Sequence, residues 1–72
     1  MENAIKELRH KRIPKITQLE LAKEIGVSES MVCQYEAGLK NPSLKTLMKL
    51  TKGFSKLLEK SITINDIIRS PT

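Results

Sequence analysis

Apolar residues recur every three or four positions along this chain of 72 residues, and no stretch alternates strictly as a half-buried strand does. In a first predicted helix, over residues 2–12, Ile5 and Leu8 share one face and basic side chains occupy most of the other. Pro14 ends this helix, because a proline disfavours helical geometry in the residue before it. The pattern as a whole predicts an all-α bundle of five short helices.

Two short helices joined by a tight turn follow. Thr17 is a suitable N-cap for the first of them, and Glu20, three residues later, completes a T-x-x-E capping box. Gly26 ends that helix, because glycine adopts the left-handed conformation at little cost. Ser28 caps the next predicted helix, from residue 29 to about residue 37, which stops at Gly38. The side chains expected to be buried are Leu21, Ala22, Ile25, Val32 and Tyr35.

The C-terminal half predicts one long helix and one short helix. After a loop over residues 39–42, Ser43 caps the long helix, whose continuity is weakened by Gly53, since an interior glycine costs about 1 kcal/mol relative to alanine. Its apolar side is formed by Leu44, Leu47, Leu50, Thr51, Phe54, Leu57 and Leu58. The last helix, over about residues 64–69, is capped by Thr63 or Asn65.

Composition restricts the class of protein. Thirteen Lys and Arg against eight Asp and Glu give a net charge of +5. A chain this short predicts one domain, residues 1–72 with a core over about residues 4–60, and leaves little room for a catalytic or small-molecule pocket, so an enzyme is not expected. One Cys and one His supply neither a disulfide nor a structural metal site, and no cofactor is expected. Without a signal-peptide core or membrane span, the expected location is the cytoplasm, with no membrane partner.

Residues 18–37 have the spacing of a helix-turn-helix unit. Ala22 is small where two helices cross closely, Gly26 lies in the turn, and Val32 and Tyr35 pack the second helix against the first. Such a unit holds its second helix on the surface, where the first turns can enter a DNA major groove about 12 Å wide.

The chain resembles the Cro/repressor-type (XRE-type) helix-turn-helix proteins of phages and bacteria over about residues 4–58. The matching residues are Thr17-Gln18-x-Glu20-Leu21-Ala22, Gly26-Val27-Ser28, Val32-x-x-Tyr35-Glu36-x-Gly38 and Asn41-Pro42-Ser43-Leu44, with Leu47 and Leu50 beyond. The resemblance implies a compact lambda-repressor-like DNA-binding domain with its helix-turn-helix at the second and third helices.

The resemblance also implies that bases are contacted from the first turns of the third helix. The expected base contacts are Glu29, Ser30, Met31 and Gln34. Gln34 suits this role best, because its amide can bond adenine N6 and N7 together, whereas Glu29 can accept from cytosine N4 or repel incorrect sites.

Contacts to the DNA backbone are expected around these residues. The candidates are Gln18, Ser28, Lys40, Asn41 and Ser43. Gln18 opens the second helix, where exposed backbone N–H groups favour an anion, and Ser28 is expected both to cap its helix and to touch a phosphate. The candidate structural residues of the unit are Ala22, Gly26, Val32, Tyr35 and Glu36.

Some features depart from the family's pattern or stay open. The link Ile13-Pro14-Lys15-Ile16 is about two residues longer than usual, and Leu19 stands where a polar residue is usual. The family often buries an Arg of the first helix against the Glu of the third. Arg9 with Glu36 is the expected pair, with Lys11 or Arg12 as the alternatives. The lysines 45, 49, 52, 56 and 60 form a stripe that is either a solvated face or an attraction to DNA.

The tail is rich in isoleucine, with Ile62, Ile64, Ile67 and Ile68. Some of these side chains should fold back on the core, and Ile64, Ile67 and Ile68 are candidates for a dimer contact.

Taken together, the motif and the resemblance predict a sequence-specific double-stranded DNA-binding regulator, a repressor or controller. It is expected to act as a homodimer on a two-fold operator, without a small-molecule ligand. The alternative is a protein adaptor or antitoxin-type module that reuses the fold to bind a partner such as a cognate toxin.

Overall fold

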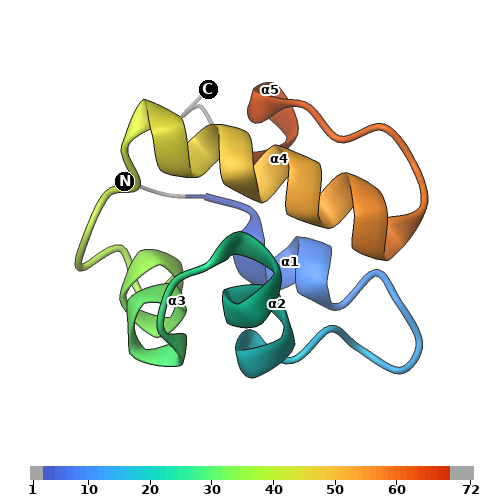
Figure 1. The fold of residues 1–72 in the computed structure, drawn as a ribbon, viewed down its shortest axis with the longest axis horizontal. Helices are drawn as coiled ribbons and strands as arrows, with labels where there is room; N and C mark the ends of the chain where they lie inside the picture. The colour runs from blue at the N-terminus through green and yellow to red at the C-terminus, as the bar shows by residue number, and fades with distance from the viewer. Residues whose placement is uncertain (1–2, 69–72) are drawn as a thin grey trace.

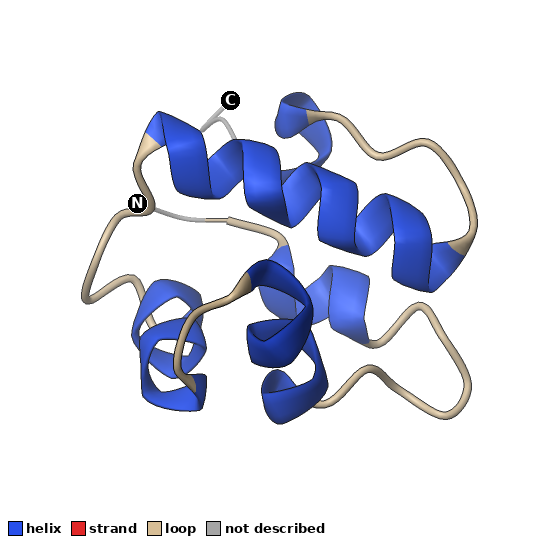
Figure 2. Ribbon diagram, in the orientation of Figure 1, coloured by secondary structure: helices blue, strands red, loops and turns tan. Residues whose placement is uncertain are grey.

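A computed structural model describes residues 3–68, which form five helices as predicted (Figures 1 and 2). They are α1 (Ile5–Arg9), α2 (Gln18–Ile25), α3 (Glu29–Glu36), α4 (Leu44–Leu58) and α5 (Ile64–Ile67). The long helix α4 crosses over the three shorter helices before it, and α5 lies beside α4 (Figure 1). The described residues are all-α, and their one β-type pairing is an isolated bridge between Asn3 and Ile68.

A single apolar core lies between α4 and the other helices. Its fully buried large side chains are Phe54, Ile5, Ile16, Leu21, Leu50, Ile67 and Val32. All five side chains expected to be buried in the two short helices are buried. The core also includes Ile62 and Ile67, two of the tail isoleucines, some of which were expected to fold back on it, and so it extends past residue 60.

The first helix is shorter than predicted, with five residues in place of residues 2–12. The Arg9 carbonyl, which a longer helix would pair with residue 13, accepts from the Ile16 N–H at 2.8 Å. The helix thus ends at Arg9, five residues before Pro14, so the prediction that Pro14 ends it was wrong. The chain then forms a loop that projects at one corner of the fold (Figure 1).

The remaining helix starts follow the predicted caps. The hydroxyls of Thr17, Ser28 and Ser43 accept the backbone N–H three residues later, at 3.0, 3.1 and 3.2 Å. Thr63 caps α5, and its N–H donates to Asp66 Oδ2 at 2.8 Å. This contact lowers the pKa of Asp66, first through the backbone hydrogen bond and then through the Thr63 hydroxyl.

Helix α4 is continuous through Gly53, although an interior glycine was expected to weaken its continuity. A Cβ built on Gly53 would lie 2.8 Å from Ile25 Cγ2, so glycine allows α2 and α4 to approach closely there. The apolar side of α4 buries Leu47, Leu50 and Phe54. Leu44 was wrongly assigned to this side, because it is 66% exposed at the first turn, beyond the reach of the core.

The C-terminal segment closes against the N-terminus. The Ala4 N–H donates to the Ile67 carbonyl at 2.8 Å, and Ile67 has no exposed surface. Ile67 therefore cannot contact a second chain in this fold. Of the predicted dimer candidates, Ile64 and Ile68 remain, and both are half-buried. The predicted end of this helix at residue 69 falls outside the described residues. No described helix is long and apolar enough to cross a membrane.

Candidate nucleic-acid interface

The turn between α2 and α3 sets the angle at which α3 stands on the surface. Gly26 has a left-handed backbone, with φ of 75°, and the Val27 N–H donates to the Ala22 carbonyl at 3.0 Å. Ser28 then begins α3, whose inner face buries Val32 and Tyr35. Five sequence-predicted structural residues thus lie at this junction or on the inner side of α3: Ala22, Gly26, Val32, Tyr35 and Glu36.

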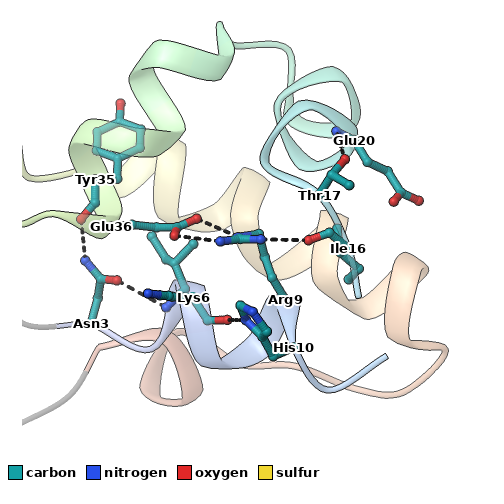
Figure 3. Close-up of polar contacts among 10 residues, drawn as sticks. Asn3, Lys6, Arg9, His10, Ile16, Thr17, Glu20, Tyr35 and Glu36 are labelled. Atoms are coloured by element: carbon teal, nitrogen blue, oxygen red, sulfur yellow. Dashed lines mark hydrogen bonds and ion pairs between the residues drawn. The ribbon is translucent and has the colours of Figure 1, made fainter. Parts of the chain in front are cut away.

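A buried ion pair fixes the C-terminal end of α3 to α1 (Figure 3). Arg9 Nε donates to Glu36 Oε2 at 2.6 Å, and Arg9 Nη2 donates to Oε1 at 2.9 Å. The two side chains are only 6% and 7% exposed. Arg9 Nη1 also donates to the Ile16 carbonyl at 2.9 Å, so one guanidinium joins α1, α3 and the segment before α2.

The structure confirms Arg9 as the partner of Glu36 and excludes the two alternatives. Arg12 instead pairs with Glu20, and Lys11 lies exposed beside the cleft between α1 and the segment that precedes α5. A second contact at the same end of α3 was not predicted. Asn3 Nδ2 donates to the Tyr35 carbonyl at 2.8 Å (Figure 3), and this carbonyl in the last turn of α3 also accepts from the Gly38 N–H at 3.2 Å.

The opposite end of α3 presents its side chains to solvent. Ser28, Glu29 and Ser30 are exposed, and Gln34 is half-buried one turn further on. Gln34 Nε2 lies 3.4 Å from Ser30 Oγ, a long contact between two predicted base-contacting groups. Met31 is half-buried and packs on the core, so part of its side chain is committed to the fold.

The predicted backbone-contacting residues lie at helix starts and in the loop before α4. Gln18 is the first residue of α2 and is half-buried, while Lys40 and Asn41 are exposed. The Ser43 hydroxyl accepts from the Thr46 N–H and donates to Thr46 Oγ1 at 3.1 Å. Since the hydroxyl is satisfied within its own helix, the free backbone N–H groups are what this helix start offers an anion.

The ion pair between Arg12 and Glu20 was missed in the sequence. Arg12 Nη1 and Nη2 donate to the two carboxylate oxygens at 2.9 and 2.6 Å. Chiefly through these bonds, Arg12 lowers the pKa of Glu20, and the Thr17 backbone N–H adds to the effect. In the sequence, the one feature that marks the link between α1 and α2 is its extra length, together with its basic residues.

Four of the five lysines of the stripe lie on α4, and Lys60 lies just beyond its end. All five are exposed, as the pattern predicts, and Lys56 Nζ lies 3.5 Å from Glu24 Oε2. Within residues 3–68, no cluster of His, Cys, Asp and Glu could hold a metal ion.

A short turn between two crossed helices, with the second helix anchored by its C-terminal end and exposed at its N-terminal end, defines a helix-turn-helix protein. A helix-turn-helix family model matches residues 5–60. The chain is 41% identical over 59 residues to an uncharacterized HTH-type transcriptional regulator of Archaeoglobus fulgidus, covering 82% of this chain and 80% of that protein. No solved structure gives a significant match. The chain belongs to the helix-turn-helix family of transcriptional regulators of the Cro/repressor (XRE) type.

Proposed function

We propose that this chain binds double-stranded DNA sequence-specifically in the cytoplasm and regulates transcription, inserting α3 into the major groove as one half of a homodimer. The observation that carries the proposal is the difference between the two ends of α3. Its C-terminal end is held by Arg9 and Asn3, and its first turn is exposed and carries only polar side chains before Met31. A helix held this way can enter a groove without losing its position on the domain.

The candidate side chains divide into two groups by chemistry. Glu29, Ser30 and Gln34 can form hydrogen bonds with base edges, with Met31 contributing apolar contact. Gln18, Ser28, Lys40, Asn41 and Ser43 surround them at helix starts and in the loop before α4, where backbone N–H groups and a lysine suit phosphates.

The test is a titration against short duplexes that tile the DNA flanking the chain's own coding region, at two salt concentrations. Gln34→Ala should relax base preference at one position, at roughly 1–3 kcal/mol, whereas Lys40→Ala should weaken all duplexes alike. Asn65→Ala is the matched control, because it removes an exposed amide from α5. Binding no tighter than to random duplex would refute the regulator, and equal uniform losses in both variants would refute the division of roles.

A second candidate function, binding of a protein partner, is favoured by exposed apolar side chains next to α3. Leu39 is 80% exposed in the loop after α3, and Leu44 and Met48 lie four residues apart on α4 at 66% and 48%. Residues four apart share one face of a helix, so these two form a small apolar surface. Recovery of a neighbouring gene product with the tagged chain, together with absent DNA binding, would favour this adaptor or antitoxin-type function.

A further inference from the structure

The loop between α1 and α2, residues 11–15, is held by hydrogen bonds at its base. The Ile16 N–H donates to the Arg9 carbonyl at 2.8 Å, and Arg9 Nη1 donates to the Ile16 carbonyl at 2.9 Å. These two bonds bring the residues on either side of the loop together, so the loop leaves the body of the fold and returns to it at one place (Figure 1).

Above this base, Arg12 crosses from the loop to α2. Its Nε donates to the Pro14 carbonyl at 3.0 Å, while Nη1 and Nη2 hold the Glu20 carboxylate. Ile13 at the tip is 96% exposed, so the core contributes nothing to the position of the tip. Above its base, the loop is therefore held by Arg12 and Glu20. The hydrogen bonds from Arg12 are the chief cause that lowers the pKa of Glu20, so its carboxylate stays charged to a lower pH than an unpaired Glu does.

Lys15 is the cation that this arrangement leaves available beside α2. It is exposed, and within residues 3–68 it makes no hydrogen bond or ion pair, whereas the charge of Arg12 is matched by Glu20. Lys15 lies two residues before the N-cap Thr17, a backbone separation of at most about 7 Å. A lysine side chain at that distance can bind an anion next to one at the start of α2.

We propose that residues 11–15 form a preorganised contact for duplex DNA, in which Lys15 binds a backbone phosphate beside the start of α2 and Arg12 and Glu20 position it. This rests on the proposed function, and it assigns a role to the extra length of the link. Lys15 is the contact, and Arg12 and Glu20 are positioning residues that act through the loop.

The experiment measures the salt dependence of binding to a mixed-sequence duplex of about 24 base pairs, from 50 to 200 mM NaCl. Lys15→Gln should lower the slope of log K against log salt by about 0.9, so wild-type affinity falls roughly 3.5-fold more than that of the variant over this range. Lys11→Gln is the matched control. It removes the same charge from the same loop, but Lys11 faces the cleft lined by Glu7, Lys60 and Asp66, and its slope should equal that of wild type.

The positioning role is tested in a background without the ion-pair geometry. Arg12→Lys keeps the charge but loses the two-pronged guanidinium contact, and Glu20→Gln removes its partner. In the Arg12→Lys/Glu20→Gln background, Lys15→Gln should change the slope by far less than 0.9, with urea unfolding confirming that each variant is folded.

The outcomes separate the two proposals. Wild-type protein that binds no duplex refutes the proposed function. Wild-type protein that binds with a steep slope, while Lys15→Gln keeps that slope or Lys11→Gln lowers it equally, refutes the loop contact alone. An undiminished effect of Lys15→Gln in the Arg12→Lys/Glu20→Gln background refutes the positioning role.

Discussion

The ion pair between Arg9 and Glu36 is the interaction on which the placement of α3 most depends, and its energetics can be tested directly. Glu36→Ala removes the carboxylate that pairs with Arg9, whose side chain is 6% exposed in the native fold, and leaves the Ile16 carbonyl as its one remaining acceptor in the described residues. An unpaired buried charge of this kind costs about 3–5 kcal/mol. Domains of this length have a total stability of roughly 4–11 kcal/mol, so the variant loses a large fraction of it.

Replacing both partners by apolar residues should cost much less than the two single changes together. Arg9→Met/Glu36→Leu removes both charges and leaves the Ile16 carbonyl without its side-chain donor, at about 1–3 kcal/mol. The two single variants, each leaving one buried charge, sum to roughly 6–10 kcal/mol. The coupling free energy between Arg9 and Glu36 is therefore several kcal/mol.

Urea unfolding followed by circular dichroism measures these differences. With a slope near 1 kcal/mol/M for so small a domain, Glu36→Ala should move the midpoint down by roughly 3 M or abolish the native baseline. Arg12→Met/Glu20→Leu is the control, because that pair is 29% and 37% exposed, and losing it should cost less than about 1 kcal/mol. If the Arg9→Met/Glu36→Leu variant costs as much as the sum of its single changes, the argument from buried charge is refuted.

Three further predictions concern the fold. Gly53→Ala should destabilise by about 1 kcal/mol, since the clash with Ile25 Cγ2 outweighs the helix propensity gained; Ile25→Leu, which lacks that methyl, should relieve the loss, whereas Ile25→Val, which keeps it, should not. Because the pKa values of Glu20 and Asp66 are lowered in the folded chain, their contributions to folding stability are complete above about pH 5 and are lost as the pH falls further. Glu20→Gln and Asp66→Asn should each make the Tm depend less on pH between pH 5 and 2. An unchanged dependence of the Tm on pH in both variants would contradict this. Ile67→Asp should unfold the chain, because it buries a charge in the core, whereas Ile64→Asp should keep its helicity; a folded Ile67→Asp in sedimentation would show that this assignment is wrong.

Helix starts and the core were predictable from the sequence because each depends on residues close together in the chain. Thr17, Ser28 and Ser43 cap the N–H three residues later, and the apolar periodicity of α2 and α3 selects their buried side chains correctly. The end of α1 was not predictable this way. It is fixed by a hydrogen bond from Ile16 across the loop, which no local pattern encodes.

The candidate site shows the same division. Glu36 and Arg9 could be paired only through the family resemblance, because they lie 27 residues apart. Arg12 with Glu20 and Asn3 with the Tyr35 carbonyl have no signal in spacing. The first depends on how the loop after α1 folds against α2, and the second on how the residue before α1 lies against α3. Gly53 was expected to weaken α4. The need for a glycine there comes from the close approach of Ile25, which depends on how α2 packs against α4.

The pairing of charges changes the electrostatic picture of the helix-turn-helix. Its sequence carries four Glu against Lys23 and suggests a recognition unit that repels DNA. In the structure Glu36, Glu20 and Glu24 are paired with Arg9, Arg12 and Lys56 from outside the unit, and of the four Glu only Glu29 has no ion pair among the described residues. Three of the four negative charges are therefore offset by cations from other parts of the chain, and the buried pair of Arg9 and Glu36 also holds α3 in place. The one that is not cancelled sits in the first turn of α3, among the proposed base contacts, where repulsion of DNA is strongest unless Glu29 finds a donor. An exposed cytosine N4 amino group is such a donor, so under the proposed function we expect Glu29 to favour duplexes that present one and to repel those that do not.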